Sequence, residues 1–478
     1  MSLIKTLKNS FYFGVIPKLS VLINVILLPI ITPYLTPYDY GVWGIISSYS
    51  GFIVALVPLG LNMHLSNSFF EYKKWRLVWG HILFLFLLSG FIGAIIFVSI
   101  MMLELRDFSY GMRFLIGVCA SFPILLFGNN QLAIHLYPLL ERPKPLVFRN
   151  LAGSICSIAI SFVVIYVFRL GFWGFVLGAM GNAIVTFVLF IPPLYFKESI
   201  KPTIDKNVRR VKNWLKEAAP VIPHTLGFIL LSSSSRIIMS WYDVPLEDIG
   251  IFSNGYMIGD YITIVATSLA TALSPQIQRA YRSGSFDNYR KLYYLCQLIV
   301  IGIVFCFSFW MSEIYGLLIR NSAFTEAIPV ASYICYANAL MPLYVFVSSI
   351  CFIEKRTLHL LWLVFLPGIL NMSLCLIFIP IYGYKVAIYS TLIAFWSQLL
   401  VPYISKYHKN KIKLWLGSRY KLLMLLATLL SAVVLSNSLI VSSLTIKIII
   451  TVVILATIVS MLKIKGWDKA MVNVQIVS

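Results

Sequence analysis

The chain has 478 residues, of which 60% are hydrophobic and only 12% are charged, and its mean hydropathy is +0.88. Soluble domains have about 45–50% apolar and about 25% charged residues, so the composition excludes an ordinary soluble enzyme. The net charge of +21 does not indicate a nucleic-acid partner, because the basic residues lie in short loops between apolar runs, where Lys and Arg set membrane topology.

The apolar residues form runs of about 20 residues, which is the length that crosses a hydrocarbon core of about 30 Å as a helix. A transmembrane barrel would show alternating segments of about 10 residues instead. We therefore predict an all-α integral membrane protein with about 14 transmembrane helices and no cleavable signal peptide. The predicted spans are 11–35, 40–62, 80–103, 112–136, 147–168, 171–194, 217–240, 249–272, 289–311, 326–351, 358–379, 384–405, 421–441 and 446–463.

Lysine and arginine predict the orientation of these spans. With the N-terminus placed in the cytoplasm, 30 of the 38 Lys and Arg residues fall on the cytoplasmic side, 6 fall outside and 2 lie within spans. Cytoplasmic loops of membrane proteins are enriched in these two residues. The sequence therefore predicts that both termini are cytoplasmic and that the number of spans is even.

The longest basic loop, 197–216, separates two halves that begin alike. Val15-Ile-Pro-Lys18 in the first predicted span matches Val221-Ile-Pro-His224 in the seventh. Pro37 and Gly41 flank an acid before the second span, and Pro245 and Gly250 flank acids before the eighth. Chance could produce such short matches, but their order favours a repeat. Six spans separate the copies, so both run in the same direction, as in two-lobed transporters that bind substrate between their lobes.

This repeat predicts two pseudo-symmetric six-helix lobes around a central cavity, followed by two C-terminal helices. The expected parts are an N-terminal lobe over 1–196 (spans 1–6) and a basic cytoplasmic linker over 197–216. A C-terminal lobe covers 217–405 (spans 7–12), and residues 406–478 hold spans 13 and 14 with a cytoplasmic tail.

Ionisable residues inside spans are costly and usually face a cavity or a partner. Lys18, His224 and Arg236 are the basic candidates for such a cavity; the alternatives are snorkelling to headgroups, a structural histidine, and pairing of Arg236 with Asp243, Glu247 or Asp260. Asp260 lies near the middle of span 8, where a carboxylate is hardest to explain otherwise. Its helix face carries Ser253, Tyr256, Thr263, Thr267 and Thr271, at the spacing of 3 or 4 residues that lines one side of a helix.

We predict that Lys18, His224, Arg236, Asp260, Ser253, Thr263 and Thr267 line the substrate cavity. The alternative for the hydroxyl residues is that they bond neighbouring helices. Asp260 and His224 are the candidates to carry a coupling ion, H⁺ or Na⁺. The seven cysteines show no spacing suited to a metal, and no Gly-rich phosphate loop, GxSxG or HExxH sequence occurs, so we expect no cofactor and no metal.

Several short segments resemble a known family. They are Tyr34-Leu-Thr-Pro-Tyr-Asp39-Tyr-Gly41-Val-Trp43, Leu59-Gly60-Leu61, Arg169-Leu-Gly171-Phe-Trp-Gly174, Ala219-Pro220-Val-Ile-Pro223, Ser235-Arg236 and Ile249-Gly250-Ile-Phe252-Ser253. With these segments the chain resembles the polysaccharide-export branch of the multidrug/oligosaccharidyl-lipid/polysaccharide (MOP) superfamily, and more narrowly the Wzx-type O-antigen flippases. The sequence departs from the family at Ser235, where the family has an acid, and after Leu61, where His64 is the nearest basic candidate.

The resemblance implies fourteen helices in two lobes in the bacterial inner membrane. It implies transport of an undecaprenyl-pyrophosphate-linked oligosaccharide from the cytoplasmic to the periplasmic leaflet. It also implies membrane lipid, a polysaccharide polymerase and a chain-length regulator as partners, and no nucleic acid. The alternatives are a multidrug or organic-cation antiporter of the same fold, and a membrane polymerase or glycosyltransferase acting on lipid-linked sugars. A non-catalytic scaffold is the remaining alternative, which no specific feature favours.

Overall fold

The structure is a computed structural model that describes residues 16–205, 207–354, 356–416, 445, 447–449, 451, 452 and 456. Its ordered elements over these residues are all helical, which confirms the predicted fold class. Each of the first twelve predicted spans falls on a helix. Within the described residues, eight helices are long and apolar enough to cross a membrane, and a bent pair, Leu246–Ala270 and Leu273–Arg282, adds a ninth. Span 13 and most of span 14 lie outside the described residues, so a total of fourteen is compatible with the structure.

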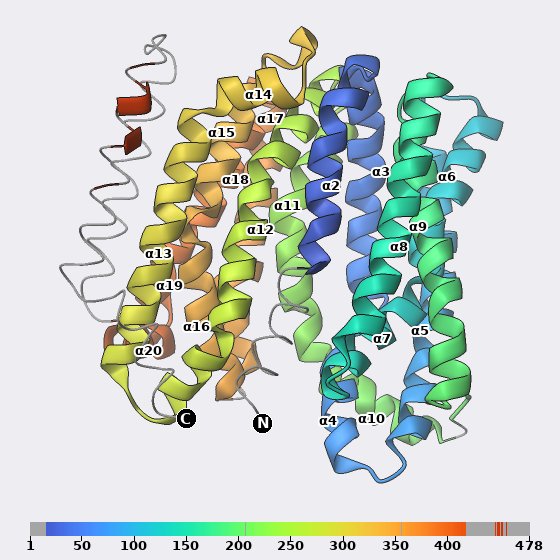
Figure 1. Cartoon of the computed structure of the whole chain (residues 1–478), viewed down its shortest axis with the longest axis vertical. Helices are drawn as coiled ribbons and strands as arrows, with labels where there is room; N and C mark the ends of the chain where they lie inside the picture. The colour runs from blue at the N-terminus through green and yellow to red at the C-terminus, as the bar shows by residue number, and fades with distance from the viewer. Residues whose placement is uncertain are drawn as a thin grey trace. The chain divides into compact units, whose positions relative to one another are not determined.

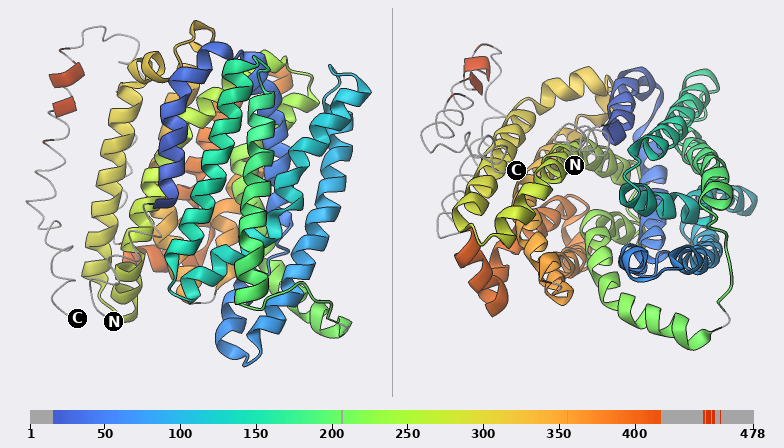
Figure 2. Two further views of the ribbon diagram at one scale, coloured as in Figure 1. Left: turned by 45° about the vertical axis from the view of Figure 1, so that its right-hand side comes forward. Right: turned by 60° about the horizontal axis from the view of Figure 1, so that its bottom comes forward.

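The chain folds into two compact units, of which unit 1 holds residues 1–251 and 318–323. Figures 1 and 2 show α4 and α10 at the same end of the unit. The helices of unit 1 are α2 (Ile16–Ile31), η1 (Thr32–Tyr34), α3 (Pro37–Leu56), α4 (Asn62–Glu71), α5 (Trp75–Glu104), α6 (Tyr110–Leu125), α7 (Phe127–Leu139), α8 (Pro143–Phe162), η2 (Val163–Val167), α9 (Trp173–Ile191), η3 (Pro192–Lys197), α10 (Val208–Ala218), η4 (Ala219–Val221), α11 (Ile222–Trp241) and the first turns of α12 (Leu246–Arg282).

Unit 2 holds residues 252–317 and 324–478, and so includes most of α12. Its remaining helices are α13 (Phe286–Phe309), α14 (Met311–Leu318), η5 (Ser322–Phe324), α15 (Ala327–Ala337), η6 (Asn338–Leu340), α16 (Met341–Ile353), η7 (Thr357–His359), η8 (Leu361–Phe365), α17 (Leu366–Tyr382), α18 (Val386–Trp396), η9 (Ser397–Leu400), α19 (Val401–Ile404) and α20 (Lys406–Trp415), with α14 and η5 partly in unit 1. The predicted boundary between lobes at 197–216 stays a prediction, since α10 and α11 pack within unit 1.

Prolines account for several interruptions of the long helices. Pro275 lies in α12 near its bend of 52°, and Pro342 is the second residue of α16, which starts directly after the short turn η6. Pro123 lies in the last turns of α6, shortly before the chain starts α7. A proline removes one helical hydrogen bond and clashes with the preceding turn, so a helix kinks or restarts there.

Ion pairs inside each unit join residues that the predicted topology puts on the same side of the membrane. Arg106 pairs with Asp243 at 3.8 Å and Arg142 with Glu198 at 3.3 Å in unit 1. Lys385 pairs with Glu326 at 3.3 Å in unit 2. This agreement is compatible with the predicted alternation of spans.

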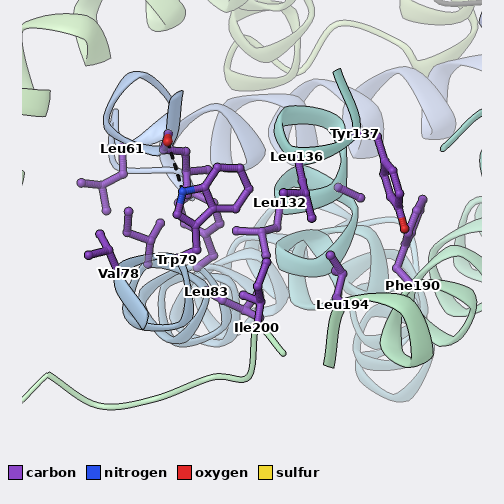
Figure 3. Packing of buried hydrophobic residues seen from close by; sticks show 14 of the residues in the cluster. Leu61, Val78, Trp79, Leu83, Leu132, Leu136, Tyr137, Phe190, Leu194 and Ile200 are labelled. Atoms are coloured by element: carbon purple, nitrogen blue, oxygen red, sulfur yellow. Dashed lines mark hydrogen bonds between the residues drawn. The ribbon is translucent and has the colours of Figure 1, made fainter. Parts of the chain in front are cut away.

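A buried apolar cluster of unit 1 joins residues of α4 and α10 to residues of α5, α7 and α9, and Figure 3 shows part of it. Trp79 of α5 is fully buried within it, and its indole N–H donates to the carbonyl of Leu65 and the hydroxyl of Ser68, both at 3.1 Å. Trp214 of α10 and Leu132 of α7 belong to the same cluster. The basic segment after span 6 is therefore fixed to the unit by an apolar side of α10.

Candidate functional site

Two predicted cavity residues lie on α11 in unit 1. His224, in the first turn, is 8% exposed, and its ring lies edge-on to Phe228 with the ring centroids 5.5 Å apart. Arg236 lies in the last two turns, where its Nη1 donates to the hydroxyl of Ser48 on α3 at 3.2 Å. The arginine therefore lies against a polar residue of the neighbouring helix and is partly buried.

Lys18 is the third predicted cation. The structure places its backbone in the first turn of α2, as expected, whereas its side chain lies outside the described side chains. Its direction toward a cavity therefore stays a prediction. The predicted interactions of Arg236 with Glu247 or Asp260 stay predictions too, while Asp243 forms an ion pair with Arg106.

Asp260 lies on α12 in unit 2 and is partly buried. Its Oδ1 accepts a bond of 3.3 Å from the amide nitrogen of Asn338, and its Oδ2 accepts one of 3.3 Å from the hydroxyl of Thr263. Thr263 and Thr267 also donate to backbone carbonyls of α12 itself, both at 2.7 Å. Ser253, two turns earlier, is buried and its hydroxyl oxygen has no hydrogen-bond partner among the described residues. The predicted polar face of α12 thus forms one continuous row beside a carboxylate.

The structure adds buried carboxamides that the sequence prediction missed. Asn338 is 2% exposed and lies in η6, the turn that interrupts span 10. Gln297 of α13 is fully buried and donates to the carbonyl of Ala339 in the same turn at 2.8 Å. Asn254, next to Ser253, accepts a bond of 3.0 Å from the hydroxyl of Tyr315. An interrupted helix leaves backbone carbonyls that need donors in the membrane, which explains amides at this position.

The predicted residues therefore fall into two groups. His224, Arg236 and the backbone of Lys18 belong to unit 1, and Ser253, Asp260, Thr263 and Thr267 belong to unit 2. A signal for the missed residues was present in the sequence, because Asn338 precedes Pro342 inside an apolar span. A cavity that all seven residues share stays a prediction.

At the end of unit 1 where α3 begins, two of the family-like segments meet through Asp39. Its carboxylate accepts bonds from the backbone N–H and the hydroxyl of Thr36, at 2.8 and 2.7 Å, which caps the N-terminus of α3. The other oxygen accepts the backbone N–H of Phe172 at 2.9 Å. Gly171, in the left-handed region at φ +54°, leaves no room there for a Cβ. One carboxylate thus joins the segments around 34–43 and 169–174.

Arg169 strengthens the same junction. Its guanidinium carbon lies 3.5 Å from the ring centroid of Tyr34 and 5.4 Å from that of Tyr166. Trp43 of α3 stacks on Phe175 of α9 with ring centroids 5.6 Å apart. Cation–π contacts of this kind contribute about 0.5–1 kcal/mol at exposed sites. The family-like segments at this end therefore hold helices together.

We expect Asp39→Ala to lower the stability of the protein by about 1–2 kcal/mol, because it removes the cap of α3 and the acceptor for Phe172. Thermal unfolding in detergent measures the change. Asp287→Ala is the matched control, since Asp287 also lies in the first turn of a helix, α13, but its side chain is 85% exposed. An equal, small effect of both substitutions would contradict the proposed junction.

Two other family-like segments meet at the opposite end of α3. Leu59 and Gly60 adopt φ +50° and +74°, and a Cβ on Gly60 would clash with the carbonyl of Ala218, which precedes the segment Ala219–Pro223. His64, the candidate for the missing basic residue, lies 5.2 Å from the ring of Trp214. Burial lowers the pKa of His64, although Glu217 and Glu71 act in the opposite direction. Neutral His64 therefore does not supply a permanent positive charge.

In unit 2, a cluster of ionisable residues fixes the basic helix α20. Glu354 accepts bonds from the hydroxyls of Tyr281 and Tyr407 and forms an ion pair with Lys411. Burial alone would raise the pKa of Glu354, but the bonds from Lys411, Tyr281 and Tyr407 outweigh it and hold that pKa below its usual value. His408 is fully buried behind the cluster, with its Nδ1 2.9 Å from the hydroxyl of Ser405.

We expect acid to destabilise this end of unit 2. Burial, with a smaller contribution from His359, lowers the pKa of His408 to about 4, whereas an unfolded histidine titrates near 6.5. Between these two pH values the unfolded chain binds the proton and the folded chain does not. The free energy of unfolding therefore decreases as the pH is lowered, by at most about 1.4 kcal/mol per pH unit. His359, whose pKa is also lowered, acts in the same direction.

Thermal unfolding in detergent between pH 6.5 and 5 tests this expectation, because Glu354 remains ionised there. His408→Asn should flatten the pH dependence. A pH dependence as steep in His408→Asn as in the unchanged chain would show that His408 is not its source.

No group of three or more His, Cys, Asp or Glu side chains that could hold a metal ion occurs in the described part of the chain. The geometry instead consists of helix junctions built from family-like segments and two sets of polar groups inside spans. Residues 6–281 match the family described as "Polysaccharide biosynthesis protein". The chain belongs to this family.

The fold is shared with solved transporters. A multidrug resistance MATE family transporter of the MOP superfamily, in an inward-facing conformation, matches with a TM-score of 0.62 and 14% identity, over 86% of this chain and 99% of that chain. The eukaryotic MATE transporter AtDTX14 matches with a TM-score of 0.53 and 14% identity, over 91% of this chain and 99% of that chain. No curated protein matches the sequence. The family and the fold together confirm the resemblance to the polysaccharide-export branch of the MOP superfamily.

Within this polysaccharide biosynthesis family member, the family-like segments lie mainly where backbones approach closely, at the two ends of α3. Ser235-Arg236 is the exception: Ser235 is 2% exposed, and the Arg236 side chain reaches Ser48. Apart from Ser235-Arg236, the segments therefore stabilise contacts between helices.

Proposed function

We propose that the protein is a flippase that moves an undecaprenyl-pyrophosphate-linked oligosaccharide, of the O-antigen or capsule type, from the cytoplasmic to the periplasmic leaflet by alternating access. The observation that carries this proposal is the match of residues 6–281 to a polysaccharide biosynthesis family in a chain with the MATE fold. A polysaccharide that is assembled on a lipid inside the cell needs a transporter for that lipid.

The charges inside the spans support an anionic substrate. Lys18, His224 and Arg236 would attract the pyrophosphate, and attraction between charges is stronger in a low-dielectric cleft than in water. Aromatic residues, 15% of the chain, would offer faces to sugar rings while the prenyl tail stays in the bilayer. Asp260 or His224 would carry the coupling ion, H⁺ or Na⁺.

Four acidic residues of the predicted outer loops take part in structural contacts, which argues against a polymerase or glycosyltransferase that uses them. Asp39 caps a helix, and Asp243, Glu313 and Glu326 form ion pairs with Arg106, Lys447 and Lys385. An enzyme acting on sugars would need such acids to converge on a substrate. We accordingly propose a transporter in the inner membrane with both termini cytoplasmic, working with a polysaccharide polymerase and a chain-length regulator.

A multidrug or organic-cation antiporter is the second candidate. Solved proteins of this fold include a multidrug resistance transporter, and Asp260 offers a carboxylate that a cation could bind. The two candidates differ in the charge of the substrate, so they predict different effects of the same deletion.

Deleting the gene in a strain that makes surface polysaccharide distinguishes them. For a flippase, the lipid-linked repeat unit accumulates in the cytoplasmic leaflet, where an impermeant enzyme added to spheroplasts cannot reach it. Wild-type protein restores export and Arg236→Ala does not. Normal polymer together with raised drug sensitivity would favour the antiporter, and flipped but unpolymerised units would favour a polymerase.

A further inference from the structure

A pocket of about 360 Å³ lies in unit 1 beside the first turn of α5 and η3, and none of its lining residues belongs to the proposed transport site. It is lined by Arg76, Leu77, Tyr195, Phe196, Ser199, Lys201 and Thr203. Its volume is within the range of about 300–1,000 Å³ that small-molecule sites occupy. Two of the lining side chains are cationic and none is acidic.

The side chain of Arg76 is held in position by Glu198. Its Nε donates to the backbone carbonyl of Glu198 at 2.9 Å, and its Nη2 lies 3.8 Å from the carboxylate. The Glu198 side chain is only 8% exposed and also pairs with Arg142, whereas the Arg76 side chain is 52% exposed. Because Arg76 and Arg142 share the one carboxylate of Glu198, the three groups together keep a net positive charge. Hydrogen-bond donors of Arg76 also stay accessible to an anion.

Other groups around the pocket could also bind an anion. Lys201 lies 5.5 Å from the ring centroid of Phe196. Ser199 and Thr203 offer hydroxyls, and the Thr203 hydroxyl lies 3.2 Å from Nδ1 of His81. Arg76 and Leu77 belong to the first turn of α5, a helix of 30 residues whose N-terminus no side chain caps. The positive end of this helix dipole adds to the attraction for an anion.

The pocket also has apolar walls that a soluble phosphate would not use. Leu77 is 49% exposed and Phe196 is 71% exposed. Both lie at ends of predicted membrane spans, Trp75–Glu104 and Trp173–Lys197, and therefore at the level of the lipid headgroups. Basic pockets at such a level are typical binding sites of anionic lipid headgroups.

We propose that this pocket binds the phosphate of an anionic phospholipid, with the acyl chains lying along Leu77 and Phe196. The bound lipid would stabilise the segment that leads into α10, since Thr203 contacts His81 and the His81 ring lies 6.4 Å from that of Trp214. This site does not depend on which substrate the protein transports.

The test uses the full-length protein in phosphatidylcholine nanodiscs or detergent, titrated with phosphatidylglycerol. Binding is followed by native mass spectrometry and by the unfolding temperature. We expect saturable binding and a higher unfolding temperature with phosphatidylglycerol than with phosphatidylcholine. Lys201→Gln should weaken binding about fivefold, since one basic residue near a charged lipid surface contributes about 1 kcal/mol. Lys212→Gln, on the exposed side of α10 and outside the pocket, is the matched control.

Three results would overturn the proposal. Equal weakening by Lys201→Gln and Lys212→Gln would mean unspecific attraction to the basic segment. Equal affinity for phosphatidylcholine and phosphatidylglycerol would exclude recognition of the lipid charge. Displacement of the lipid by millimolar glycerol 1-phosphate, with no loss of affinity in Phe196→Ala, would identify a site for a soluble phosphate. Unchanged unfolding temperatures of the lipid-free variants show that each substitution leaves the fold intact.

Discussion

Asp260→Asn is expected to reduce transport at least tenfold while leaving the protein folded. The substitution keeps an oxygen that can accept the bond from Asn338 and removes only the negative charge. A tenfold effect corresponds to about 1.4 kcal/mol. This is small compared with the interaction energy between a charge inside the membrane and the groups around it. The measurement is restoration of surface polysaccharide in the deletion strain, with expression and unfolding temperature recorded for each variant.

Two further variants make this result specific. Asp287→Asn removes an exposed carboxylate that pairs with Arg290 at 3.6 Å in the first turns of α13, and it should restore export fully. Thr263→Val removes a donor to Asp260 and keeps the charge, so we expect a weaker effect than that of Asp260→Asn. Full export by Asp260→Asn would show that the charge has no part in transport. Failure of Asp287→Asn to export would show that the assay responds to any lost carboxylate.

Much of the fold follows from hydropathy alone. Runs of apolar residues are long and separate, and each of the first twelve falls on a helix because a membrane leaves the backbone few alternatives. The helix boundaries differ from the predicted ones where local chemistry decides. Span 10 restarts as α16 at Met341, one residue before Pro342, and α10 forms a helix of its own before α11. Hydropathy cannot locate α10, because it is a basic helix with a single buried edge.

The candidate site was less predictable, and the reason is chemical. A charge inside an apolar run is conspicuous, so Arg236 and Asp260 are found readily from sequence. Their contacts, Ser48 and Asn338, are neutral and lie far away in the chain, and an uncharged polar residue in a span has many explanations. The family-like Asp39 could be read as a loop acid, and only the fold reveals that it accepts the amide of Phe172.

In the predicted repeat, acids lie between Pro37 and Gly41 and between Pro245 and Gly250. These two turns are in contact in the structure. A Cβ on Gly41 of α3 would lie closer than 3.0 Å to the carbonyl of Leu246, and one on Gly250 of α12 would lie equally close to the carbonyl of Pro37. The two helix starts therefore touch backbone to backbone, and each glycine faces the first residue of the other helix. This reciprocity explains why both copies carry glycine a few residues after proline.

Gly41→Ala should consequently destabilise the protein by about 3 kcal/mol or more, because a backbone carbonyl cannot rotate away as a side chain can. Gly51 provides a control on the same helix, since a Cβ there meets nothing within 4 Å. Gly51→Ala should be neutral or stabilising by up to about 1 kcal/mol, the difference in helix propensity. Thermal unfolding of the two variants in detergent decides the matter. If Gly41→Ala unfolds at the same temperature as Gly51→Ala, the two helix starts are not in backbone contact, and the repeated glycines need another explanation.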